Sequence, residues 1–103
     1  MSTLHTVNKS PFERGSLASC LAHALPGDTV LLVEDAAVAA RASATATAEL
    51  LEAAMPACAV HVLGPDLAAR GIPETALVDG ITVIDYGGFV DLVAAHDKTH
   101  AWL

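Results

Sequence analysis

The chain has 103 residues, of which 53% are hydrophobic and 17% charged, and 12 acidic against five basic residues give it a net charge of −7. A protein that binds a nucleic acid or an anionic membrane surface needs clustered Lys and Arg, so this net negative charge excludes both as direct partners. Because few charged residues remain to cover the surface of a small domain, we expect a subunit that buries surface against other proteins.

Length and cysteine content indicate a small intracellular protein. We expect one domain over residues 1–103. No apolar run approaches the ~20 residues that span a bilayer, and the N-terminus lacks the basic and apolar segments of a signal peptide. Cys20 and Cys58 form neither a CxxC pair nor a zinc-ligand set. The expectation is a cytoplasmic protein with reduced thiols and with no metal or cofactor.

The first quarter of the chain predicts a strand, a loop and a helix. Residues 4–7 are the expected strand and 8–15 the polar loop, and Ser16 is the expected N-cap of the helix. Leucines at helical spacing over 17–25 form one apolar stripe, and Cys20 lies beside it. The Pro-Gly pair that follows ends this helix.

The middle of the chain predicts two strands around a broken helix. Residues 28–34 have a continuous apolar centre, which is typical of a central strand covered on both faces. A short helical turn is expected over 36–40 and a longer helix over 42–55, with a break near 41–43. The third strand is expected over 57–63.

The last third of the chain continues the same alternation, with Asp66 as the expected cap of a short helix. The elements expected here are a helix over 67–70, a strand over 81–86, a helix over 89–96 and a last strand at the end of the sheet over 98–103. Alternating strands and helices predict an α/β fold of three layers, α/β/α, around a mostly parallel sheet of about five strands with right-handed crossovers.

Short motifs follow one another in a fixed order from residue 4 to residue 103. They are Leu4-His5-Thr6-Val7 leading to Ser10-Pro11, Glu34-Asp35, Asp66-Leu67-Ala68-Ala69-Arg70-Gly71, Ile84-Asp85-Tyr86 followed by Phe89-Val90-Asp91-Leu92, and Ala101-Trp102-Leu103. Each is weak alone, but through their order and spacing the chain resembles the DsrH/TusB family of sulfur-relay proteins. Ala36 stands where the family commonly has glycine, a departure that concerns only the local turn.

The resemblance implies a DsrE-like fold and a place in a cytoplasmic hetero-hexamer with paralogous subunits of the DsrE/TusD and DsrF/TusC types. Such sulfurtransferase complexes pass persulfide sulfur between cysteines and on to a DsrC/TusE-type carrier. The Tus branch delivers sulfur to 2-thiouridine of tRNA, whereas the Dsr branch serves sulfur oxidation. Cys20 and the stretch 8–14 resemble DsrH-type members more than TusB-type members, which favours sulfur oxidation.

Cys20 is the residue that the resemblance marks as a persulfide relay. A relay thiol attacks as a thiolate, which a helix start or a nearby cation favours. Lys9, Ser10 and Arg14 lie in the preceding loop, from which the two cations can approach the thiol. The alternative is a small core residue, because Cys20 shares the apolar stripe of its helix. The family's main acceptor cysteine is implied to lie on the DsrE/TusD-type subunit.

The remaining candidates have structural interpretations. Cys58 suits a buried strand position, and Glu34-Asp35 suits a helix cap. The five histidines lack the spacing of metal ligands, although His5 is placed to hydrogen-bond the loop. Trp102 either covers the core or anchors an interface.

The leading hypothesis is a subunit that relays persulfide through Cys20 within such a complex. Three alternatives stay open: a non-catalytic structural subunit, the TusB role in tRNA thiolation, and a small domain that binds an anionic ligand at residues 8–15.

Overall fold

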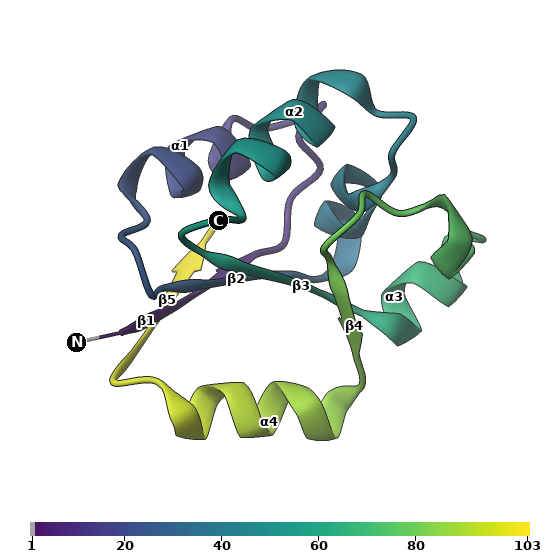
Figure 1. The fold of residues 1–103 in the computed structure, drawn as a ribbon. Helices are drawn as coiled ribbons and strands as arrows, with labels where there is room; N and C mark the ends of the chain where they lie inside the picture. The colour runs from purple at the N-terminus through teal and green to yellow at the C-terminus, as the bar shows by residue number, and fades with distance from the viewer. Residues whose placement is uncertain (1) are drawn as a thin grey trace.

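The computed structural model describes residues 2–103 and contains, within them, one five-stranded sheet (Figure 1). Every pair of neighbouring strands is parallel, and the order is β4-β3-β2-β1-β5. The strands are β1 (Thr3–Val7), β2 (Thr29–Leu32), β3 (Ala59–Leu63), β4 (Thr82–Ile84) and β5 (Lys98–Trp102). The α/β class, the parallel sheet and the last strand at its edge are confirmed.

Helices cover both faces of the sheet, as the alternation of elements predicted. One face carries α1 (Ser16–His23), η1 (Glu34–Ala40), α2 (Thr45–Ala54) and α3 (Gly64–Ala69), and the other carries α4 (Tyr86–Ala95) (Figure 1). The strand order explains this division. The chain steps in one direction from β1 to β4 and then returns to β5, so crossovers of one hand place α4 on the opposite face.

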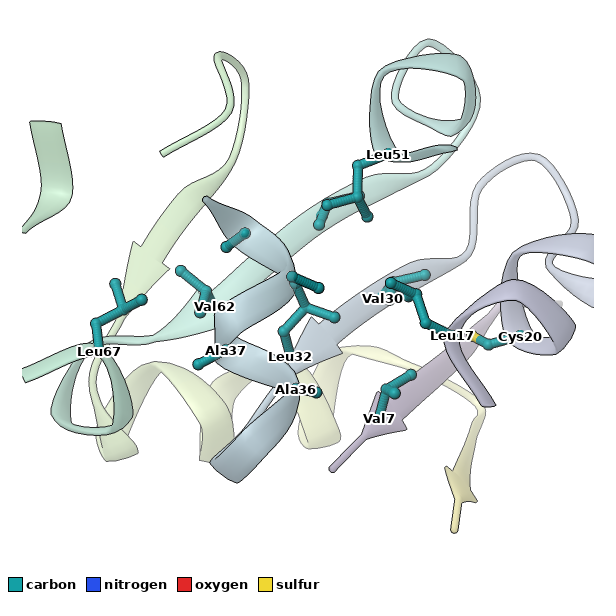
Figure 2. Packing of buried hydrophobic residues seen from close by; sticks show 13 residues of the cluster. Val7, Leu17, Cys20, Val30, Leu32, Ala36, Ala37, Leu51, Val62 and Leu67 are labelled. Carbon is teal, nitrogen blue, oxygen red and sulfur yellow. The ribbon is translucent and has the colours of Figure 1, made fainter. Parts of the chain in front are cut away.

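The main core lies between the sheet and the helices α1, η1, α2 and α3 (Figure 2). Alanines fill the inner side of η1, which lets this helix approach the sheet closely. The labelled core residues in Figure 2 are Val7, Leu17, Cys20, Val30, Leu32, Ala36, Ala37, Leu51, Val62 and Leu67. Leu4 and Leu31 are also fully buried and alternate with the core residues of their strands, so they lie on the α4 face.

Several element boundaries differ from the sequence prediction because side chains form hydrogen bonds with the backbone there. The fourth strand ends at Ile84, since Oδ1 of Asp85 accepts the N–H of Gly88 at 2.8 Å and so begins α4. The prediction that Ser16 caps α1 is wrong. Ser16 lies inside the helix, and its hydroxyl donates to the carbonyl of Leu103 at 3.0 Å.

The capping prediction for the carboxylates after β2 is also wrong. The N-cap position of η1 is Val33, which makes no side-chain capping bond, and Asp35 instead pairs with Arg70 at 2.8 Å. Asp66 does not cap α3 as expected, because it lies within the first turn of that helix, where its Oδ2 accepts the backbone N–H of Glu34 at 2.6 Å. Glu34 itself has a φ of 50°, which is left-handed backbone. These contacts join η1 to α3 at the carboxyl edge of the sheet.

The break expected near residues 41–43 is confirmed. η1 ends at Ala40 and α2 begins at Thr45. The backbone between them bonds to the long connection before β4, with the N–H of Ala42 donating to the carbonyl of Ala76 at 2.8 Å. The connection holds a short helix, η2 (Glu74–Ala76).

Candidate functional site

Cys20, the thiol that the sequence singled out, lies on the inner side of α1 and is fully buried. Figure 2 shows it beside Leu17 in the core, near Val7 of β1 and Val30 of β2. It is the fifth residue of the helix, one turn beyond the N-terminal backbone groups that would favour a thiolate. The fold therefore gives Cys20 the position of a small apolar residue.

The electrostatic surroundings of Cys20 oppose thiolate formation. Burial raises its pKa to about 12, and the nearby Cys58 and Asp28 act in the same direction. The groups that perturb this thiol do not include Lys9 or Arg14 of the preceding loop. At neutral pH Cys20 is a protonated thiol with no solvent-exposed surface in this conformation.

The loop residues predicted to support Cys20 are engaged locally or exposed. The hydroxyl of Ser10 accepts the N–H of Phe12 at 3.2 Å, and the carbonyl of Ser10 accepts from Glu13 and Arg14. Arg14 is exposed and Lys9 is half-buried. The structure thus arranges a tight turn here and does not bring these side chains together with the thiol.

Cys58 is buried as the sequence predicted, one residue before β3. Its thiol donates to the carbonyl of Leu25 at 3.3 Å. Burial raises its pKa, and the charge of Asp28 adds to the effect. The charge of the same carboxylate therefore acts on both cysteines and disfavours a negative charge on either sulfur.

Asp28, which the sequence did not single out, organises a buried polar cluster at this end of the sheet. Its carboxylate accepts the N–H of Thr3 at 3.0 Å, the N–H of Leu25 at 3.0 Å, and a bond from Nε2 of His5 at 2.9 Å. Burial alone would raise the pKa of Asp28, but these hydrogen bonds outweigh it, and the pKa lies below its usual value. The carboxylate stays ionised.

His5, which was expected to hydrogen-bond the loop 8–15, instead links this carboxylate to the C-terminal strand. The indole N–H of Trp102 donates to Nδ1 of His5 at 3.0 Å. Because an indole nitrogen can only donate, Nδ1 of His5 must be an acceptor, and its proton sits on Nε2 facing Asp28. Both ring nitrogens are thus used, so His5 has none left to act as a base on a bound molecule.

A shallow pocket of about 340 Å³ opens beside the cluster, between the end of α1 and β5. The rings of His100 and Trp102 stack in it at 4.5 Å, with His23 at 5.5 Å from Trp102. His5 and Asp28 of the cluster line the same pocket. Trp102 is half-buried and packs on the core, as one of the two interpretations of this residue proposed.

The sequence missed this cluster because its members are far apart along the chain. His5 and Trp102 are separated by 97 positions and meet only because β5 pairs with β1. Asp28 was a usable signal, because it is an acidic residue directly before β2, a strand whose residues are all buried. Such a carboxylate requires donors, and His5 was the candidate nearest in the expected sheet.

Residues 2–103 hold no group of three or more His, Cys, Asp and Glu side chains arranged to bind a metal ion. Within the same range no helix is both long and apolar enough to cross a membrane.

Comparisons with known proteins bear on the whole chain. A sequence profile described as "DsrH like protein" matches residues 9–99. The chain is 34% identical over 99 residues to protein TusB of Pectobacterium parmentieri, covering 96% of this chain and 99% of that protein. It is 35% identical, with the same coverage, to protein TusB of Yersinia pestis strain Pestoides F.

Solved structures show the same fold at lower identity. The crystal structure of the YchN protein from E. coli superposes with a TM-score of 0.79 at 18% identity, covering 98% of this chain and 99% of that one. MTH1491 from Methanobacterium thermoautotrophicum gives a TM-score of 0.72 at 11% identity, covering 94% and 96%. These similarities concern the fold alone.

Proposed function

Because the chain belongs to the DsrH-like family, and resembles TusB proteins over nearly its full length, we propose that it is a subunit of a sulfur-relay complex. Its partners are the paralogous subunits of the DsrE/TusD and DsrF/TusC types, with which it forms a hetero-hexamer in the cytoplasm. The complex passes persulfide sulfur to a DsrC/TusE-type carrier. The low content of charged residues supports a subunit that buries surface against partners.

Within that complex the chain has a structural role and does not carry sulfur. The observation that supports this most strongly is the state of Cys20, which is fully buried and has a pKa of about 12. Accepting a persulfide sulfur requires an exposed thiolate. A relay through Cys20 remains the competing hypothesis, and it requires α1 to leave the sheet.

The proposed destination of the sulfur is 2-thiouridine of tRNA. The relatives at 34% and 35% identity are both named TusB, which supports the Tus branch. The preference for sulfur oxidation rested on Cys20 and on the loop that precedes it. Since Cys20 is packed as a core residue, its presence is a weak guide to the branch.

The test is reconstitution of the complex with a Cys20→Ala variant, with Ser19→Ala, on the exposed side of α1, as the matched control. We expect both variants to assemble and to support sulfur transfer to the carrier within about two-fold of the wild type. Loss of transfer with Cys20→Ala in an intact complex would establish the relay. Failure of the wild-type chain to assemble with the paralogous subunits would overturn the proposed function itself.

The branch is tested in cells that lack their own TusB. Restoration of 2-thiouridine in tRNA by this chain together with its paralogous subunits is the expected result. Absence of the thiolated nucleoside, with the complex assembled, would favour sulfur oxidation.

A further inference from the structure

The helix α4 turns an apolar stripe away from the sheet. The stripe consists of Tyr86, Phe89, Val90, Val93 and Ala94, which share one side of the helix at spacings of three and four residues. Tyr86 is 61% exposed, Val90 67% and Val93 43%. Together Phe89, Val90, Val93 and Ala94 line a shallow apolar hollow of about 390 Å³.

The side of α4 that faces the sheet adjoins the stripe and carries the half-buried residues Gly88, Leu92 and His96. Nε2 of His96 bonds to the hydroxyl of Thr29 at 2.8 Å. Gly88 approaches Ile84 so closely that a Cβ at this position would lie 2.9 Å from the Cβ of Ile84. Since these contacts fix which side of α4 faces the sheet, the stripe cannot turn inward. An apolar surface held outward in this way is typical of a docking site.

The charged residues of α4 and of the positions that flank it, 85–97, are all acidic. Asp85 and Asp97 stand at its two ends and Asp91 beside its middle, and there is no Lys or Arg between residues 71 and 97. Two of these carboxylates are fixed in place, Asp85 by the N–H of Gly88 and Asp97 by the N–H of Ser2 at 2.8 Å. A second copy of α4 would bring these carboxylates against their equivalents, which is repulsive.

We propose that the α4 stripe docks a partner subunit through an apolar surface that is flanked by Lys and Arg. This inference rests on the proposed function, which supplies partner subunits, and it adds which face of this chain one of them covers and with what chemistry. The apolar side chains provide the attraction, and the acidic flank selects a basic rim. In Figure 1 α4 stands apart from α1, α2 and α3, on the far side of the sheet, so this contact is separate from the helices of the main core.

The experiment measures assembly of the full chain with its paralogous subunits by light scattering and by titration. Val90→Glu places a charge in the centre of the stripe, and Leu50→Glu places the same charge on exposed α2, on the other face of the sheet. We expect Val90→Glu to weaken assembly at least about ten-fold and Leu50→Glu to weaken it less. Both positions are exposed, so circular dichroism is expected to show folded proteins.

A third variant tests the charge. Asp91→Lys reverses the flank of the stripe, and we expect it to weaken assembly and to reduce the dependence of the dissociation constant on salt. If neither Asp91→Lys nor salt changed assembly, the proposal that the partner surface is flanked by Lys and Arg would be wrong.

The outcomes separate the two proposals. A wild-type chain that does not assemble with the paralogous subunits overturns the proposed function and this inference together. Wild-type assembly that Val90→Glu weakens no more than Leu50→Glu overturns this inference alone. A self-association of the isolated chain that Val90→Glu abolishes would show that the occupant is a second copy.

Discussion

Trp102 donates its indole N–H to Nδ1 of His5 at 3.0 Å and so joins the last strand of the sheet to the first. β5 lies at the edge beside β1, where Val7 and Trp102 are direct partners in the register. The bond also fixes the tautomer of His5, which in turn holds Asp28. One indole nitrogen thus completes the hydrogen bonding of a buried cluster.

Replacing Trp102 by Phe should destabilise the protein. The substitution leaves Nδ1 of the buried His5 without its donor, which costs about 1–3 kcal/mol. Urea unfolding measures the loss, with Tyr86→Phe as the control because this phenol is exposed on α4. Equal stabilities of the two variants would contradict the assigned role of the bond.

Asp28 should give the protein an acid-dependent stability. Its pKa is lower in the folded chain than its unfolded value of about 3.9. As the pH falls, the unfolded chain therefore takes up a proton first. The contribution of Asp28 is complete well above pH 4 and is lost as the pH falls through the folded pKa.

The comparison of wild type with Asp28→Asn isolates this effect. We expect the variant to be less stable by about 2–3 kcal/mol at pH 7, because its amide N–H₂ faces backbone and imidazole donors. The difference should shrink as the pH falls below the unfolded pKa of about 3.9 and through the lower folded pKa. If the difference in unfolding free energy between the two proteins did not change with pH, the carboxylate of Asp28 would not be the source of the acid dependence.

The buried thiol makes a prediction about chemical reactivity. With a pKa of about 12, only about one in ten thousand Cys20 side chains is ionised at pH 8, and none of the side chain is exposed. We expect iodoacetamide to leave Cys20 unmodified in the folded chain and to modify it fully in urea, as read by peptide mass spectrometry. Rapid alkylation without denaturant would mean that α1 opens.

The left-handed backbone at Glu34 predicts a stabilising substitution. A residue with a Cβ pays about 1–2 kcal/mol at this φ of 50°, and glycine does not. Glycine also has more conformational entropy in the unfolded chain, which offsets part of this gain. We therefore expect Glu34→Gly to raise the free energy of unfolding by about 0.5–1 kcal/mol. Glu49→Gly is the matched control and should lose about 1 kcal/mol, because Glu49 lies within α2. A loss at both positions would contradict this account of Glu34.

The sequence predicted the fold well because its signals are local and repeated. Apolar strand centres and amphipathic helices placed nearly every element, and the motifs from Leu4 to Leu103 identified the family, which the matches to TusB proteins confirm. The boundaries were less accurate where one side chain decides them. Asp85 ends β4 by capping α4, and this competition between strand and helix has no periodic signature.

The candidate site was harder to predict because it depends on strand order. The partners of His5 come from the turn before β2 and from β5, and only the order β2-β1-β5 brings them together. For Cys20 the spacing and the family resemblance favoured different interpretations. The spacing, which placed it on the apolar stripe, agrees with the burial observed.

The central claim, that this chain supports a sulfur relay without carrying the sulfur, is tested most directly by mass spectrometry. The assembled complex is loaded with a persulfide donor, and each subunit is then weighed intact and mapped by peptides. We expect the added sulfur on a paralogous subunit and none on Cys20, whose thiol is buried and protonated. A gain of one sulfur atom on Cys20 would contradict the claim.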